Sequence, residues 1–403
     1  MAAAYDLDSS DISSLFKINY DKPSEATFNS YNATISKVRI RNDFTGTSKQ
    51  FPVPLSHGGS VGSGTLPTAN AAIYSTATIT RKKVYGRYTI DRETIYASKD
   101  DKGAFVRVTK EGVENVVKSY MRNMSRIMYG NSDGSLGTFS GNAGGSAGTP
   151  TITIISTDWK KANWEEQDYV NVNSLTSVWE ITAVNPTTRV VTLNRISGTD
   201  DLTGIGAGTH TVYMQNSKNN DPEGLKGVTD ATGSTKYGIS VGRRWQSYQK
   251  DLTGSPSITP DLLNEAMLTI EENSGKVPNL IAMSYVQYRK YLSQLEDFKR
   301  YVTDVKPRSE ALKGKVSFPG LQYISSNGVV DIVPERFVED DRVYFLNTDE
   351  IVIHRAPNFG WFDDDGTVLL RVTDQDEYEA RYGGYLQIYI NPAFQGRIKG
   401  LST

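Results

Sequence analysis

The sequence predicts an α+β protein of more than one domain, and three observations support this prediction. A long helical pattern ends at Gly130, a region of alternating strands precedes it, and a block of short strands follows at residues 150–216. Apolar residues that recur every three to four positions indicate a helix, whereas strict alternation indicates a strand. The chain has 403 residues, with 37% hydrophobic and 10% aromatic content. It is therefore long enough for two or three domains.

The composition argues against several classes of protein. The formal net charge is −2, so the chain lacks the overall positive charge that is typical of nucleic-acid-binding proteins. Cysteine is absent, which excludes disulfides and thiol-ligated zinc, and the three histidines lie far apart in sequence. No apolar run approaches the ~18 residues of a membrane span, and the N-terminus lacks a signal-peptide pattern. We therefore expect no membrane partner and no cofactor.

The first ninety residues predict an arm followed by a long hairpin. Residues 1–33 are polar and weakly patterned, which is typical either of an arm lying on another surface or of a disordered tail. Residues 34–90 show two alternating strand regions around a Gly- and Ser-rich tip at 56–65. Because a lone hairpin of this length cannot bury both faces, we expect it to lie against another surface, such as a neighbouring subunit.

The strands that flank this tip are locally basic. Their cations have three interpretations: a solvated face, a salt-bridging surface for a neighbouring subunit, or a phosphate contact. The near-zero net charge disfavours the phosphate contact. The candidate inter-subunit contacts are Lys37, Arg39, Arg41, His57, Arg81, Lys82, Lys83 and Arg87.

A helix is predicted next, and a linker follows it. One apolar stripe of the helix consists of Val113, Val117, Tyr120, Met124 and Ile127. The helix begins either at a Thr109 cap or earlier, near Gly103, and Gly130 is a suitable stop. Residues 135–150 are rich in Gly and Ser and are interpreted as a linker.

The block at 150–216 predicts a small inserted barrel or sandwich. Its expected strands are 151–155, 169–172, 178–184, 189–193 and 211–214, and Asn185-Pro186-Thr187-Thr188 supplies a turn. Further on, Thr259-Pro260-Asp261 opens a helix that Gly275 closes, and a second helix begins at Ser284. Strands are expected at 321–325, 343–346, 351–354 and 385–390.

Motifs for catalysis and metal binding are weak. The Gly-x-Ser-x-Gly spellings at 58–62 and 144–148 lack the strand before the serine and the helix after it that a hydrolase nucleophile needs. The Asp-rich segment 363–366 lacks the ligand spacing of a calcium loop and is interpreted as a turn. No phosphate-binding loop is present.

The order of these segments resembles the major capsid proteins of tailed bacteriophages, which have the Hong Kong 97-like fold. The stretches that carry the resemblance are 97–105 before the helix, the junction 126–134, the return segment 224–228, and the pair 365–371 and 378–380. The resemblance implies an α+β fold with an N-terminal arm at 1–33, an extended β-hairpin loop at 34–90 and a peripheral domain with a long spine helix at 91–148. It further implies an inserted small β-barrel or sandwich domain at 149–217, an axial domain at 218–355 and closing strands of the peripheral domain at 356–403.

The same resemblance implies a non-enzymatic, self-assembling shell protein. Copies would form hexamers and pentamers of an icosahedral shell around packaged double-stranded DNA, which they would contact non-specifically. The implied partners are a portal, possible decoration or head-completion proteins and, because no long charged helical segment opens this chain, a separate scaffolding protein. The protein would be a virion component assembled in a bacterial cytoplasm. Residues 56–70 contain no Lys, so a lysine cross-link through the loop tip is not expected.

Three alternatives stay open. An encapsulin-type nanocompartment shell shares the fold, although the inserted block favours a virus. A carbohydrate-binding virion protein would use Trp159, Trp164, Tyr169 and Trp179, which are otherwise core residues. An enzyme would need a clustered pair of acids that the sequence does not identify.

Overall fold

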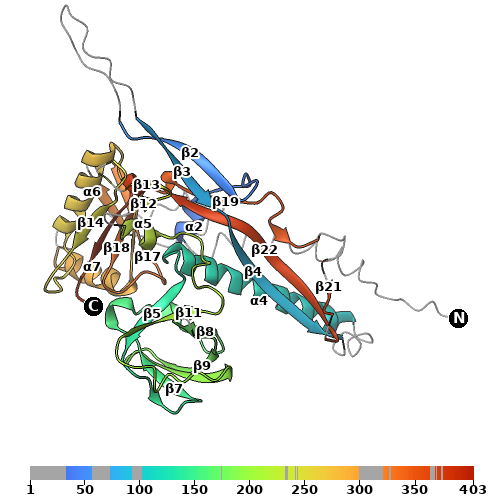
Figure 1. Ribbon diagram of the computed structural model, residues 1–403. Helices are drawn as coiled ribbons and strands as arrows, with labels where there is room; N and C mark the ends of the chain where they lie inside the picture. The colour runs from blue at the N-terminus through green and yellow to red at the C-terminus, as the bar shows by residue number, and fades with distance from the viewer. Residues whose placement is uncertain are drawn as a thin grey trace, which may run out of the picture.

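The computed structural model describes residues 33–56, 73–92, 102–173, 175–231, 235–240, 242, 244–298, 321–325, 328–363, 368, 370–373 and 375–403. Their side chains are described except at 102–111, 295–298, 321–325 and 328. The ribbon shows an elongated body with two features that extend from it, a hairpin and a long strand pair lying beside a helix (Figure 1). Of the expected arm at 1–33, all but Ala33 lies outside the described residues, as do the loop tip with His57 and residues 364–367.

The first sheet is built around the long strand β22 (Glu377–Ile390). On one edge β22 pairs antiparallel with β4 (Lys82–Asp91), from Glu377↔Asp91 to Leu386↔Lys82. Three short strands pair antiparallel with its other edge, one after another along its length. A fourth short strand pairs in parallel with the first of these three and so extends the sheet. These are β19 (Ile351–Arg355), β20 (Gly360–Trp361) and β21 (Leu370–Arg371), with β1 (Arg39–Arg41) beside β19.

The predicted long helix is confirmed as α4 (Lys102–Met128). All five residues of its predicted stripe are buried. The helix packs closely on β4, because a Cβ at Gly86 would meet a Val116 side-chain carbon at 2.8 Å. The short helix α2 (Ala33–Lys37) precedes β1, and its Ile35 joins the same core as all residues of the stripe except Val113.

A two-stranded ribbon forms the hairpin that extends from the body. It consists of β2 (Ser48–Pro54) and β3 (Tyr74–Thr80), paired from Ser48↔Thr80 to Pro54↔Tyr74 (Figure 1). This is shorter than the hairpin expected over 34–90. The ends of that range pair elsewhere, residues 39–41 with β19 and residues 82–91 with β22. Alternation identifies the strands, but it carries no information about which partner each strand takes.

The inserted block is a small barrel that begins earlier than expected. Its strand order is β5-β11-β8-β9-β10-β7-β6, and a bridge between Phe139 and Ile154 closes it. The bounds are β5 (Ser135–Ser140), β6 (Gly144–Gly145), β7 (Pro150–Thr153), β8 (Tyr169–Val172), β9 (Val178–Asn185), β10 (Val190–Ser197) and β11 (Thr209–Met214), with 3-10 turns η1 (Ser156–Asp158) and η2 (Lys161–Asn163). The expected turn is confirmed, since the Asn185 side chain accepts hydrogen bonds from the Thr187 and Thr188 amides.

The linker prediction for residues 135–150 is wrong. Leu136 and Phe139 of β5 point into the barrel core, and β5 pairs with β11 along its length. Gly137 is required there because a Cβ would meet Ile154 at 3.0 Å and Trp164 at 3.2 Å. The glycine therefore reflects tight packing in a strand rather than a linker, and the barrel extends across the expected boundary at 149.

The remaining sheet has the order β14-β23-β18-β15-β17-β16. Its strands are β14 (Tyr248–Asp251), β15 (Leu280–Met283), β16 (Leu321–Ser325), β17 (Gly328–Pro334), β18 (Val343–Leu346) and β23 (Gly396–Lys399). One face packs on α6 (Pro260–Ser274) and α7 (Tyr285–Phe298), and the other packs on the end of α4 and on α5 (Leu225–Thr229). Smaller elements are β12 (Thr235–Lys236), β13 (Ile239–Ser240), η4 (Thr348–Glu350) and η5 (Pro392–Phe394).

The caps of α6 agree with the prediction. The Thr259 side chain accepts a hydrogen bond from the Leu262 amide, and Gly275 ends the helix at φ 73°. The range 356–403, expected to close a single domain, is instead divided between two sheets. Its first part supplies β20, β21 and β22, whereas β23 pairs with β14 and β18.

Candidate assembly surface

One face of the ribbon packs on the body along the described length. Ala77 and Val53 are buried in one cluster with Trp245, Leu55 packs against that cluster, and the Phe51 ring lies 5.1 Å from that of Tyr389. At the distal end, by contrast, Tyr74 is 66% exposed and Ile73 is 60% exposed. These two apolar side chains are therefore left in water, as expected of a surface that is covered in an assembly.

The candidate contacts that precede the ribbon are near carboxylates of their own chain. The Lys37 ammonium lies 2.5 Å from an Asp331 oxygen, and the Arg39 guanidinium lies 2.7 Å from an Asp349 oxygen. Both pairs are well exposed, so each contributes little to stability. Arg41 is exposed and lies opposite His354 in the β1–β19 register.

The candidate contacts after the ribbon divide between the two faces of β4. Lys82 turns toward the insert and donates to the Asn219 carbonyl at 2.7 Å. Lys83 and Arg87 lie on the outward face, where the Arg87 guanidinium is 2.9 Å from a Glu379 oxygen. Arg81, just before β4, lies over the Tyr385 ring at 4.4 Å.

The structure adds residues that the sequence analysis missed on this outward face. Arg381, 56% exposed, ion-pairs with the same Glu379, and Lys83 lies 6.0 Å from the Tyr385 ring. Tyr85 is 43% exposed and packs edge-on against Phe362. We call Arg81, Lys83, Tyr85, Arg87, Arg381 and Tyr385 the basic–aromatic strip. The sequence shows the period-two pattern of β22, but it does not show the register of that strand against β4.

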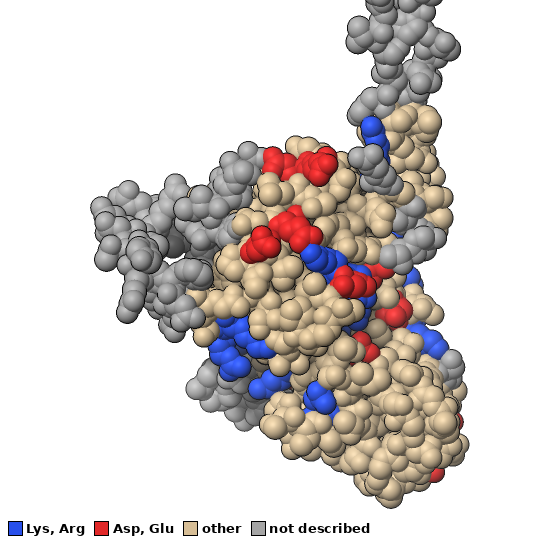
Figure 2. All heavy atoms as spheres, turned by 90° about the vertical axis from the view of Figure 1, so that its left-hand side faces the viewer, with Lys and Arg blue, Asp and Glu red and all other residues tan. Residues whose placement is uncertain are grey.

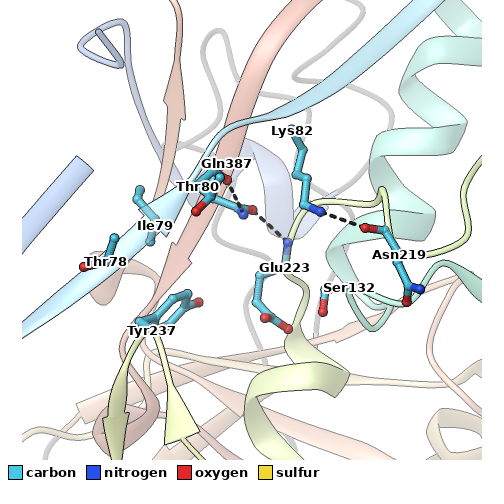
Figure 3. Close-up of a pocket in the computed structure, with 9 residues that line it drawn as sticks. All are labelled: Thr78, Ile79, Thr80, Lys82, Ser132, Asn219, Glu223, Tyr237 and Gln387. Atoms are coloured by element: carbon cyan, nitrogen blue, oxygen red, sulfur yellow. Dashed lines mark hydrogen bonds between the residues drawn. The ribbon is translucent and has the colours of Figure 1, made fainter. Parts of the chain in front are cut away.

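A polar cavity of about 270 Å³ lies where the ribbon, the first sheet and the chain leaving the barrel meet. Gln387 links the three: its amide nitrogen donates to the Thr80 carbonyl, and its amide oxygen accepts from the Glu223 backbone, both at 2.8 Å (Figure 3). Burial raises the pKa of Glu223, against the attraction of Lys236 at 3.3 Å. These contacts are already satisfied within the chain, so the arrangement holds the base of the ribbon rather than presenting catalytic groups.

A buried ionic cluster fixes the barrel to the rest of the molecule. Lys160 of the barrel lies 3.2 Å from a Glu339 oxygen and donates to the Tyr129 carbonyl at 2.8 Å. Lys226 lies 3.3 Å from the same Glu339 oxygen, and Arg342 is next to it. Burial alone would raise the pKa of Glu339, but Lys160, Arg342 and Lys226 hold it well below its usual range. Burial lowers the pKa of Lys160 to about 8, against the attraction of Glu339.

A second buried carboxyl holds α2, the helix that follows the expected arm. Glu335 Oε1 accepts hydrogen bonds from the Thr34 amide at 3.0 Å and the Thr34 hydroxyl at 2.9 Å. The Tyr129 hydroxyl lies 2.5 Å from that Thr34 hydroxyl. Burial raises the pKa of Glu335 to about 7, and the two Thr34 hydrogen bonds oppose this rise.

The face that carries α6 and α7 is mixed in charge. Figure 2 shows separate acidic and basic groups there, whereas the barrel at the bottom of the view has few charged side chains. Such a face lacks the continuous positive potential of a nucleic-acid groove.

The structure gives little support to the catalytic, metal or glycan alternatives. Within the described ranges no group of three or more His, Asp or Glu side chains could hold a metal ion. Ser146 lies in an exposed turn with its hydroxyl 2.8 Å from that of Thr149. Trp159, Trp164 and Trp179 are core residues of the barrel, at most 5% exposed. Tyr169, also expected in the core, is instead 44% exposed, but one exposed ring does not make a sugar platform. Of the helices described, none has the length and apolar character needed to cross a membrane.

Comparisons with known proteins agree with this architecture. No family model and no curated protein matches the chain. A chain of the cyanophage A-1(L) capsid asymmetric unit is similar over 91% of both chains, with 13% identity and a TM-score of 0.51. A Mycobacterium phage Bobi chain, similar over 98% of both chains, has 10% identity and a TM-score of 0.43. A capsid chain of a native GTA particle has 9% identity and a TM-score of 0.44, over 93% of this chain and 91% of that one. The similarity to the cyanophage A-1(L) capsid chain shows that this chain has the mixed α+β fold of a phage capsid protein.

Proposed function

We propose that this chain is the major capsid protein of a tailed bacteriophage. Copies assemble into hexamers and pentamers, and these close into an icosahedral shell around packaged double-stranded DNA. The observation that carries the proposal is the β2–β3 ribbon. Within the described residues it joins no other sheet, packs on the body through one face and exposes Ile73 and Tyr74 at its far end.

The described elements supply the parts that such a shell subunit needs. Under this proposal the ribbon is the stem of the extended loop, and α4 is the spine helix. The sheet around β22 is the peripheral domain, and the sheet covered by α6 and α7 is the axial domain. Residues 1–33 form the N-terminal arm, and the barrel is an insertion whose buried Lys160 fixes it to both other parts.

The energetics of shell formation favour this arrangement. Stable interfaces bury on the order of 1,000 Å² or more, and a ribbon and an arm that lie on neighbours add area that one chain alone cannot bury. Repeated over many copies, modest contacts close a shell without the disulfides that this cysteine-free chain cannot form. The near-neutral chain, with a formal charge of −2, also leaves packaged DNA free to slide over the lining.

The partners follow from the same proposal. A separate scaffolding protein guides assembly, a portal occupies one vertex, and decoration or head-completion proteins can add to the outside. Contact with DNA is non-specific. Assembly takes place in the bacterial cytoplasm, and the product is part of the virion.

Electron microscopy of the purified full-length protein, alone and with a candidate scaffolding protein, tests the proposal. We expect rings of hexamer size or closed shells. A strictly monomeric protein under all conditions would contradict it. The contents of the shells provide a second readout: nucleic acid supports a virus head, whereas a co-purifying cargo protein supports a nanocompartment instead.

A further inference from the structure

The basic–aromatic strip is an open sheet face with an excess of positive charge. The opposite face of β4 packs on α4 through Gly86, so the outward side chains of β4 turn away from the helix. Four cations lie on the strip, and Glu379 is the carboxylate that pairs with Arg87 and Arg381. Asp91 and Glu377 are register partners at the far end of the same face, so the excess of positive charge lies at the Arg81–Arg87 end, beside two tyrosine rings.

The composition of the strip suits a protein partner better than a DNA backbone. Tyrosine and arginine are the residues most enriched at the energetic centres of protein interfaces. Arg81 and Lys83 lie over the Tyr385 ring, which orders them before any partner arrives. A phosphate-binding surface would instead gain from cations without the internal carboxylate Glu379.

The first residues of this chain have the complementary chemistry. Residues 5–15 contain three carboxylates, Asp6, Asp8 and Asp11, and no Lys or Arg. They also carry apolar side chains at Tyr5, Leu7, Ile12 and Leu15 that could pack on the tyrosine rings. The segment is thus acidic where the Arg81–Arg87 end of the strip is basic.

The position of α2 indicates which copy supplies this segment. Thr34 is bonded to Glu335 and to Tyr129 just after α4, on the side of the sheet that α4 covers. The strip faces the other way, so an arm would have to pass around its own sheet to reach its own strip. The 22 residues from Asp11 to Ala33 can span up to about 70 Å, which is enough to reach an adjacent subunit.

We propose that the basic–aromatic strip binds the acidic segment 5–15 of the arm of a neighbouring copy. This inference rests on the proposed shell function and specifies one of its contacts. Each arm thereby ties its own subunit to the strip of the next one. An exposed ion pair is worth about 0.2–1 kcal/mol, so removal of one strip cation is expected to weaken the contact about 1.5- to fivefold.

Zero-length carbodiimide cross-linking of assembled full-length protein tests this contact directly, because the reagent joins a carboxylate to a lysine amine. Lys83 is the lysine of the strip, so we expect peptides that join Lys83 to Asp6, Asp8 or Asp11. Shells assembled from equal amounts of ¹⁴N- and ¹⁵N-labelled protein should give mixed-isotope pairs. Lys83→Arg is the matched control: it keeps the charge and the shell but abolishes the cross-link. Asp8→Asn and high salt should lower the yield.

Several results would overturn the inference. Pairs formed only within one isotope would place the arm on its own chain, and cross-links from Lys83 to Asp363 in place of the arm would show that the chain after Phe362 occupies the strip. Shells that form without any Lys83–arm cross-link refute this contact and leave the shell function standing, whereas absence of particles under all conditions refutes the shell function itself.

Discussion

Glu335 is a carboxyl that the fold holds in an unusual environment. It is 6% exposed, and burial raises its pKa from an ordinary 4.5 to about 7. The folded chain therefore binds a proton between pH 4.5 and 7 that the unfolded chain has lost. Since stability falls with pH wherever the native state binds more protons, this group lowers the free energy of unfolding across that window and has no further effect above pH 7.

We expect Glu335→Gln to remove this part of the pH dependence. The variant keeps an oxygen that accepts the Thr34 hydrogen bonds but cannot ionise. The wild type should lose about 3 kcal/mol more than the variant between pH 4.5 and 7.5, at about 1.4 kcal/mol per pKa unit. Urea unfolding of dissociated subunits at the two pH values measures the difference. Glu272→Gln, at an exposed position on α6, should behave like the wild type.

The Lys160 ammonium is buried at the junction between the barrel and the rest of the chain. Lys160→Met would leave Glu339 with fewer partners and the Tyr129 carbonyl without its ammonium donor. Breaking a buried pair from one side costs about 3–5 kcal/mol. Chemical denaturation should show a loss of this size, whereas Lys161→Met, at the exposed neighbouring position, should change stability by less than about 0.5 kcal/mol. Equal losses in the two variants would mean that the buried cluster does not hold the barrel in place.

Among the elements, α4 and β4 depend on a close approach at Gly86. A Cβ there would meet the Val116 side chain at 2.8 Å, and valine has little rotamer freedom with which to move aside. We expect Gly86→Ala to cost about 1–3 kcal/mol through overpacking. The thermal midpoint of the dissociated subunit measures this. Gly148→Ala, where no atom lies within 4 Å of the new Cβ, is the control and should leave the midpoint unchanged.

We expect the subunit to fold without the tip of the ribbon. The sequence of this tip is rich in Gly and Ser, so replacing residues 56–70 with a short turn is expected to leave the subunit folded. Shell closure, by contrast, should fail or weaken, because the tip finds its burial on other subunits. Circular dichroism of the subunit and sedimentation of assembly mixtures measure the two effects. A variant that cannot fold would show that the loop is part of the subunit core.

Local chemistry explains which elements could be predicted from the sequence. The start of α6 at Thr259 and its end at Gly275 follow from capping, and the turn at Asn185 follows from its side-chain hydrogen bonds. Strand β5 could not be predicted in this way. Gly137 looks like a linker residue in sequence, and only the packing of Ile154 and Trp164 around it reveals a strand.

The residues of the candidate surface could likewise be predicted only in part from the sequence. Alternation along β4 is enough to predict that Lys83 and Arg87 share one face of the strand. Arg381 and Tyr385 join them only because β22 pairs with β4 in one particular register, from residues far away in sequence. Pairing partners depend on the whole chain, which is also why the basic strands 39–41 and 82–91 were expected in one hairpin and belong to a larger sheet.

At the scale of the whole molecule, the chain combines well-packed cores with parts that extend away from them. The three largest cores lie along α4, inside the barrel and beneath α6 and α7. The ribbon extends away from these cores, whereas the long β4–β22 pair packs on α4 (Figure 1). A ribbon on one subunit that meets a different surface on the next makes a heterologous contact, and such contacts generate closed rings when the rotation between subunits closes.

An image reconstruction of the assembled particle tests this account most directly, by locating residues 48–80 relative to subunit boundaries. We predict that the ribbon lies across an adjacent copy, with Ile73 and Tyr74 covered by that copy. A particle in which every ribbon folds back onto its own subunit, or a protein that never forms a particle, would contradict the account.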